Sequence, residues 1–183
     1  VHVGNVTGLG TARMLEAVRQ VNPGIRFYQA STSELFGNQH APQSETTPMI
    51  PTSPYGVAKL YAFHMTRMYR EAYGMFCSNG ILFNHESPRR SERFLSRKVA
   101  VAVAKIKRGE QKELRVGDLT SERDWGWAPE YVGGMWKILQ HHEPDDFVLG
   151  TGVSYPARIL VEKAFFYAGL DHDRYVVRDE ALV

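Results

Sequence analysis

Two patterns of apolar residues alternate along the 183-residue chain: a helical spacing and short continuous runs. Apolar residues spaced three or four apart predict amphipathic helices, whereas short apolar runs bounded by turn residues predict buried strands. On this pattern we expect helices over 14–21, 54–73, 93–108, 129–140 and 155–168, and strands over 25–31, 75–83, 113–117 and 146–152. Strands that alternate with helices are typical of βα units and of a largely parallel sheet. The pattern therefore predicts an α/β protein, and it leaves residues 171–183 unassigned.

The helix predicted over 54–73 has well-marked ends and an unusually apolar circumference. Ser53 can cap its N-terminus, Pro54 suits the first helical position, and Gly74 ends it. A surface helix needs only one apolar stripe, but this helix leaves little of its circumference polar. It is covered either by another part of the same chain or by a second subunit. We favour a homo-oligomer formed through the helix 55–73.

Composition excludes several classes of protein. Hydrophobic residues make up 43% of the chain and charged residues 23%, which is the balance of a globular protein, and a formal net charge of +2 does not argue for nucleic acid or membrane as a partner. The sequence has neither a long apolar run nor the pattern of a signal peptide at its start. Its single cysteine, Cys77, lies in an apolar run and is expected to be buried. We expect a cytoplasmic protein.

Tyr55 and Lys59 are the first candidates for chemistry. Four residues apart on a helix, they lie on the same face. A free tyrosine, with a pKa of about 10, is a weak base at neutral pH, but a nearby ammonium group lowers that pKa. Such a pair can take a proton from a substrate hydroxyl while hydride leaves the same carbon. From the spacing alone, an ordinary helix start with an exposed lysine is the favoured interpretation.

A hydroxyl-rich segment, Thr32, Ser33 and Glu34, directly follows the strand predicted over 25–31. Ligands of open parallel sheets bind at the carboxyl ends of the strands. Hydroxyl groups beside a carboxylate at that edge can hold a sugar. A strand followed by a hydrogen-bonded turn is the alternative.

Polar and basic residues follow the next predicted strand. Asn84 and His85 come first, and a basic stretch extends from 89 to 108. Arginine side chains bind phosphate oxygens through two parallel hydrogen bonds, so Arg90 and, further along, Arg123 are candidates for anion binding. The alternatives are a solvated helix face, which we accept for the end of the stretch, and a nucleic-acid groove. Only one aromatic residue, Phe94, lies in the stretch, so a small molecule with a diphosphate fits better.

Two other motifs are set aside. The segment GLGTAR at 8–13 lacks the third glycine of the dinucleotide-binding fingerprint and follows no predicted strand. The segment HHEPDD at 141–146 has metal-ligand residue types, but its adjacent histidines point in different directions at a helix end. We interpret it as a polar helix terminus and predict no metal.

Five segments together resemble one known family. They are YQASTSELFG, SPYGVAKLYA, NGILFNHESPRR, RDWGWAPEYV and DDFVLGTG. In this order and spacing they resemble GDP-mannose 4,6-dehydratases, members of the extended short-chain dehydrogenase/reductase superfamily. The resemblance implies an incomplete Rossmann-type, doubly wound parallel sheet with part of a smaller nucleotide-sugar-binding domain. It assigns 1–92 to the C-terminal part of the NADP-binding Rossmann domain, and 93–183 to substrate-binding segments mixed with a returning Rossmann strand and helix.

The resemblance also implies a reaction, in which GDP-mannose becomes GDP-4-keto-6-deoxymannose by internal hydride transfer through NADP. Tyr55, activated by Lys59, takes the O4 proton, and Thr32 bonds near O4. Glu34 removes the C5 proton and water leaves from C6, after which hydride returns to C6. By the same resemblance the cofactor contacts are Tyr55, Lys59, His85, Arg90 and His2, and the substrate contacts are Ser33, Asn84, Lys98 and Arg123.

The chain also departs from the family pattern. Thr52 replaces an arginine, Ser91 and Arg93 are unusual, and Asp118 adds a carboxylate near the expected nucleotide site. By the resemblance, a Gly-rich turn belongs upstream of residue 1 and more of the substrate domain belongs downstream of residue 183. We therefore expect the 183 residues alone to bind little NADP and to be inactive. Another nucleotide-sugar dehydratase or epimerase, and a non-catalytic fragment or pseudoenzyme, are the alternatives.

Overall fold

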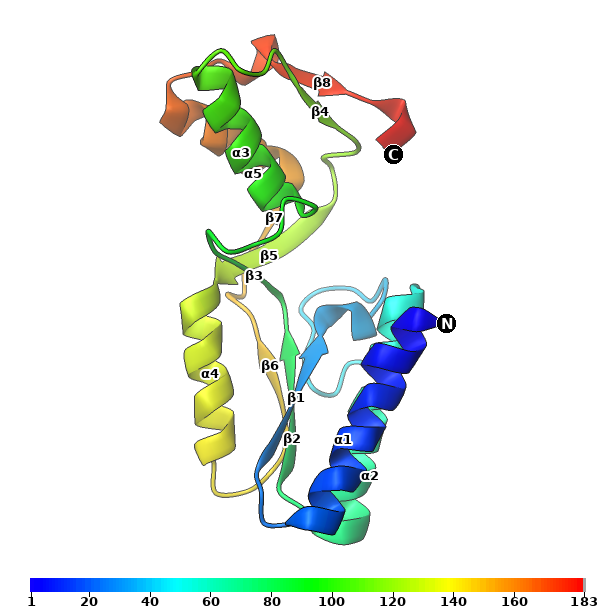
Figure 1. Cartoon of the computed structure of the whole chain (residues 1–183). Helices are drawn as coiled ribbons and strands as arrows, with labels where there is room; N and C mark the ends of the chain where they lie inside the picture. The colour runs from blue at the N-terminus through cyan, green and yellow to red at the C-terminus, as the bar shows by residue number, and fades with distance from the viewer. Residues whose placement is uncertain (183) are drawn as a thin grey trace. The chain divides into compact units, whose positions relative to one another are not determined.

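A computed structural model describes residues 1–182, and the chain divides into two compact units. Unit 1 comprises Val1–His85 and Ala128–Thr151; unit 2 comprises Glu86–Trp127 and the C-terminal segment from Gly152 (Figure 1). Part of the second half of the chain thus belongs to unit 1. The predicted assignment of 1–92 and 93–183 to functional domains stays a prediction.

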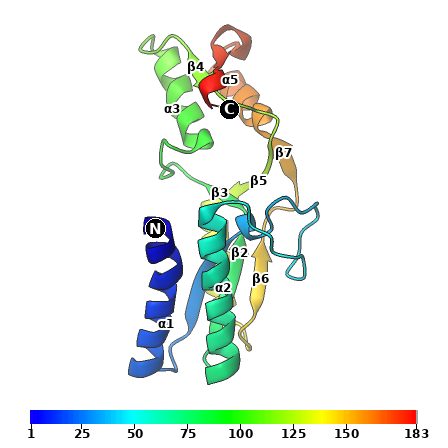
Figure 2. The same cartoon turned by 90° about the vertical axis from the view of Figure 1, so that its right-hand side faces the viewer.

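Unit 1 is built on a parallel sheet. Its strands are β1 (Phe27–Thr32), β2 (Cys77–Leu82) and β6 (Asp146–Leu149), in the order β1-β2-β6. Its helices are α1 (Gly10–Val21), α2 (Pro54–Tyr73) and α4 (Ala128–Gln140). Helices α1 and α2 cover one face of the sheet and α4 covers the other (Figures 1 and 2). This arrangement confirms the predicted Rossmann-type α/β fold.

Helix α2 has the predicted bounds because its ends are specified locally. The Ser53 side chain accepts a hydrogen bond from the backbone N–H of Gly56, and Pro54 occupies the first turn. Gly74 ends the helix in the left-handed region, at φ 63°. Two apolar clusters join α2 to the sheet; they are Leu15, Tyr69, Met75 and Cys77, and Leu35, Phe36, Phe63 and Ile81. Cys77 is buried as predicted, and burial raises the pKa of its thiol to about 11.

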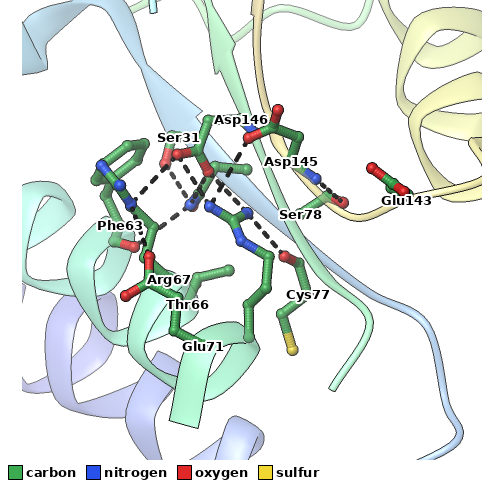
Figure 3. A network of polar contacts seen from close by, with 12 residues as sticks. Ser31, Phe63, Thr66, Arg67, Glu71, Cys77, Ser78, Glu143, Asp145 and Asp146 are labelled. Carbon is green, nitrogen blue, oxygen red and sulfur yellow. Dashed lines mark hydrogen bonds and ion pairs between the residues drawn. The ribbon is translucent and has the colours of Figure 1, made fainter. Parts of the chain in front are cut away.

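A polar network crosses the interior of unit 1 between β2, β6 and the second half of α2 (Figure 3). Arg70 donates to both carboxylate oxygens of Asp146, at 3.1 and 3.2 Å, and to the carbonyl of Cys77 at 3.0 Å. The fully buried Asn79 donates to Asp146 at 2.8 Å and to the carbonyl of Phe63 at 3.3 Å. These bonds fix the position of α2 along the sheet, because they join side chains of the strands to both the backbone and a side chain of the helix.

Unit 2 is organised around two helices and several short strands. Helix α3 (Leu95–Lys107) packs on α5 (Ala157–Ala168) through an apolar cluster that includes Val99, Val161 and Phe165. The short strands β4 (Leu114–Val116) and β8 (Val176–Arg178) are parallel. Strands β5 (Glu122–Trp127) and β7 (Ser154–Pro156) are antiparallel.

Several predicted bounds were wrong. The N-terminal helix begins well before Met14, because a π-helical segment, Gly4–Leu9, leads into α1. Strand β5 was missed because its charged sequence does not alternate, and the pairing with β7 stabilises it. That pairing also delays the start of α5 to Ala157. The strand predicted over 146–152 ends at Leu149. The unassigned tail holds 3₁₀ turns at His172–Arg174 and Glu180–Leu182 on either side of β8, and β3 is a short strand at Asn84–Glu86.

Candidate active site at the carboxyl end of strand β1

The segment Thr32–Glu34 lies at the carboxyl end of β1, as predicted. Strand β1 ends at Thr32, and a 3₁₀ turn, Ser33–Leu35, begins at the next residue. The Thr32 Oγ1 atom accepts a hydrogen bond from the backbone N–H of Glu34 at 3.3 Å. The expected alternative of a hydrogen-bonded turn is therefore part of the structure. Glu34 lies in this turn and is exposed.

The N-terminus of α2 contacts this segment through Ser53. The Ser53 hydroxyl donates to Oε2 of Glu34 at 2.9 Å and accepts from the backbone N–H of Gly56 at 2.9 Å. Gly56 permits the close approach, because a Cβ atom there would lie 2.8 Å from Cβ of Pro51 and 3.1 Å from the Glu34 carbonyl oxygen. Helix α2 and the turn after β1 therefore form one site.

Tyr55 and Lys59 lie on the face of α2 near β1. The Lys59 Nζ atom is 5.7 Å from the centroid of the Tyr55 ring and donates to the carbonyl of Ala30 at 2.6 Å. Burial lowers the pKa of Lys59. The Tyr55 side chain keeps 38% of its surface exposed. A cation held between strand and helix thus lies beside a phenol that solvent can reach.

Asn84 and His85 follow the neighbouring strand at the same edge of the sheet. Leu82 of β2 is paired with Thr32 of β1, so the two strands end together. The half-buried His85 ring stacks on Tyr131 with ring centroids 4.9 Å apart, and its Nδ1 atom is 2.9 Å from the carbonyl oxygen of Phe83. The ring is therefore held in one orientation.

The other predicted binding residues lie elsewhere in the chain. His2 is exposed in the first turn of the N-terminal helical segment. Unit 2 contains Arg90, Lys98 and Arg123. Arg90 pairs with Glu86 at 3.3 Å, Lys98 donates to the carbonyl of Arg115 at 2.7 Å, and Arg123 donates to the carbonyl of Glu122 at 2.6 Å. Their predicted roles stay predictions.

Sequence reasoning missed two features, one in each unit. Ser53 was predicted only as a helix cap, and no sequence signal indicated its bond to Glu34, 19 residues away. Asp124 was not assigned a role, and it is buried with its carboxylate accepting from the backbone N–H of Gly152 at 2.9 Å. Asp118, one of the departures, accepts from both the N–H and the hydroxyl of Thr120, and these bonds lower its pKa.

The parallel sheet with helices on both faces, and the Tyr55–Lys59 pair beside it, define a Rossmann-type protein of the short-chain dehydrogenase/reductase class. Among solved structures, RMD from Pseudomonas aeruginosa complexed with NADPH matches with a TM-score of 0.89 and 25% identity, over 94% of this chain and 60% of that one. The dTDP-glucose 4,6-dehydratase of Bacillus anthracis, in complex with NAD, matches with a TM-score of 0.85 and 23% identity, over 96% of this chain and 56% of that one.

Sequence comparison identifies the family. The model of the GDP-mannose 4,6 dehydratase family matches residues 1–181, so the chain belongs to that family. The GDP-mannose 4,6 dehydratase of Homo sapiens is 50% identical over 171 residues, which are 92% of this chain and 46% of the human protein. The enzyme of Sinorhizobium fredii is 53% identical over 172 residues, 92% of this chain and 49% of that protein. The chain thus spans about half the length of the curated relatives it matches.

Proposed function

We propose that the protein containing this chain is a GDP-mannose 4,6-dehydratase, which converts GDP-mannose to GDP-4-keto-6-deoxymannose. Membership of the family supports this proposal. The observation that carries it is the position of the Glu34 carboxylate, which is bonded at 2.9 Å to the cap of the helix that bears Tyr55 and Lys59. A carboxylate in the same site as the tyrosine–lysine pair suits an elimination that follows an oxidation.

Tyr55 and Lys59 act in the first step of the proposed reaction. Tyr55 takes the proton of the sugar O4 hydroxyl as hydride leaves C4. Lys59 has three N–H donors, and the one directed at Ala30 holds the ammonium group beside the Tyr55 ring. The positive charge favours the phenolate form of Tyr55, which is the form that can take the proton.

Glu34 and Thr32 act on the resulting ketone. The ketone at C4 acidifies the C5 proton, and Glu34 removes it. The same carboxyl group then returns a proton to the hydroxyl that leaves C6 as water. Thr32 holds the substrate near O4 through its hydroxyl, which accepts the N–H of Glu34 and so can donate to a sugar oxygen.

The residues present fit the nicotinamide end of a dinucleotide cofactor. The Lys59 ammonium group uses one N–H donor on the Ala30 carbonyl and has two more that can serve ribose hydroxyls, and the fixed ring of His85 lies at the same strand edge. We propose NADP as the cofactor; when bound, it supplies the acceptor for the C4 hydride and the donor for the return to C6. Arg90 and His2 are the further cofactor contacts that we propose.

We assign GDP-mannose binding to Ser33, Asn84, Lys98 and Arg123.

We also propose a cytoplasmic location. Among residues 1–182, none of the helices has the length and apolar character of a membrane span. A homo-oligomer through α2 is supported by the apolar side chains that remain exposed on α1 and α2, among them Met14, Val57, Tyr61 and Met68.

Incubation of the full-length protein with GDP-mannose and NADP⁺ tests the proposed function. We expect GDP-4-keto-6-deoxymannose to form without an external reductant, because the hydride is returned in each turnover. Inversion at C4 alone, or no keto product, would contradict the proposal. Glu34→Gln is the matched variant: it keeps the size of the side chain but cannot take the C5 proton, and its product formation should fall by about 10²–10⁴-fold.

A further inference from the structure

The two hydrogen-bond partners of the Ser53 hydroxyl determine the direction in which its proton points. A hydroxyl carries one donor and two acceptor positions. The backbone N–H of Gly56 can only donate, so at 2.9 Å it uses an acceptor position of Ser53. The carboxylate of Glu34 can only accept when ionised, so the Ser53 proton is directed to Oε2, also at 2.9 Å. Both contacts have the length of ordinary hydrogen bonds.

The partner of this hydroxyl is a side chain that little else restrains. Glu34 is exposed, and an exposed glutamate samples several rotamers. Its backbone is held, since its N–H donates to Thr32 and its carbonyl lies close to Gly56. The bond from Ser53 is therefore the contact that selects one orientation of the carboxylate.

We propose that Ser53 is a positioning residue for Glu34, which it aims at the C5 proton of the sugar; this inference rests on the proposed function. Because Ser53 binds Oε2, we assign the proton transfer to Oε1. The C5–H bond breaks, its proton goes to Oε1, and its electron pair enters the C4 enolate. As the C5–C6 double bond forms, the C6–O bond breaks and the hydroxyl leaves with that proton as water. Ser53 itself gains and loses nothing.

Three variants of the full-length protein separate this role from helix capping. Ser53→Gly removes the hydroxyl, yet glycine is tolerated at an N-cap. Ser53→Asp keeps an acceptor for the Gly56 N–H but replaces the donor to Glu34 with a carboxylate, which repels Glu34 when both are ionised. Ser53→Thr keeps both bonds and is the conservative control.

Steady-state product formation, C5 exchange with solvent deuterium and thermal unfolding are measured for each variant with GDP-mannose and NADP⁺. We expect Ser53→Gly and Ser53→Asp to lower C5 exchange and product formation by about 10–10²-fold, as a carboxylate misplaced by about 1 Å would. Reduction of the nicotinamide on addition of substrate, which does not use Glu34, should stay near the unaltered rate. In Ser53→Thr, the rate of C5 exchange should stay within about threefold of the rate of the unaltered protein.

Two results would overturn the proposal. If the rate of C5 exchange in Ser53→Gly is within about twofold of that of the unaltered protein, Ser53 acts only as a helix cap. Equal losses of nicotinamide reduction and C5 exchange, together with a lower melting temperature, would indicate a general structural role. Failure of the proposed function is distinguishable, because the unaltered protein would then make no keto product. In that case crystal structures of the full-length protein and of Ser53→Gly decide: the Glu34 carboxylate moves if Ser53 positions it, and an unmoved carboxylate refutes the claim.

Discussion

The two ends of helix α2 are built from different contacts. At its N-terminus Tyr55 is 38% exposed, and the cap residue Ser53 holds Glu34, which lies outside the helix. In its second half, Arg70 and its partner Asp146 keep only 12% and 10% of their side-chain surfaces exposed, and the network reaches both neighbouring strands. One end of the helix leaves chemical groups accessible, whereas the other fixes its position on the sheet.

The largest effect that we expect comes from Tyr55→Phe at the exposed end. Loss of the hydroxyl removes the proton acceptor of the first step, so product formation should fall by about 10²–10⁴-fold. The melting temperature should stay close to that of the unaltered protein, because the ring is retained. Tyr61→Phe, on an exposed tyrosine of the same helix, is the control and should leave the rate unchanged. Equal loss in both variants would contradict the role of Tyr55.

Asp146→Ala, at the buried end of the helix, should lower the stability of the fold, whereas Tyr55→Phe should not. Asp146→Ala removes the nearest carboxylate of the largely buried Arg70, which keeps an ion pair with Asp145 at the longer distance of 3.9 Å, and it removes one acceptor of the buried Asn79. Breaking such a pair lowers the free energy of unfolding by about 3–5 kcal/mol. Chemical denaturation measures this loss. The control is Glu110→Ala, which removes the exposed partner of Arg108 and should leave stability unchanged. A stable Asp146→Ala variant would show that the network does not fix the helix.

The smallest effect that we expect concerns Glu16 of α1. Its carboxylate accepts hydrogen bonds from Arg19 of the same helix at 2.7 and 2.8 Å. It also accepts from Tyr69 of α2 at 2.9 Å, and this bond joins the two helices. The Arg19 bonds are the main cause that lowers the pKa of Glu16 from 4.5 to about 2. A carboxyl group with a lowered folded-state pKa stabilises the protein above its unfolded pKa, and this contribution is lost as pH falls.

The melting temperature should therefore be higher for the unaltered protein than for Glu16→Gln near neutral pH. This difference should shrink as pH falls from 4.5 to about 2. Tyr69→Phe removes only one of the bonds and should reproduce part of the difference. A difference that is independent of pH would contradict the assignment.

The same two ends show what the sequence could and could not predict. Ser53, Pro54 and Gly74 specify the helix ends through local contacts, so they were recognised from sequence alone. The spacing of Tyr55 and Lys59 is equally local. In contrast, Asp146 was interpreted as part of a polar helix terminus, because its partner Arg70 lies 76 residues earlier.

Two further misses have the same cause. Glu34 and Ser53 meet only after the loop between them folds back, so the cap was predicted and its second bond was not. Strand β5 depends on a partner about 30 residues later, with Arg123 opposite Tyr155. Contacts between distant residues leave no periodic signal in either segment.

Isotope transfer tests the central claim most directly. The full-length protein is incubated with NADP⁺ and GDP-mannose that carries deuterium at C4, and the product is examined by mass spectrometry and NMR. If Tyr55 and Glu34 act in sequence at one site, the deuterium should appear in the C6 methyl group of GDP-4-keto-6-deoxymannose. Deuterium that stays at C4, or that is lost to solvent while a C4-inverted sugar accumulates, would contradict the account.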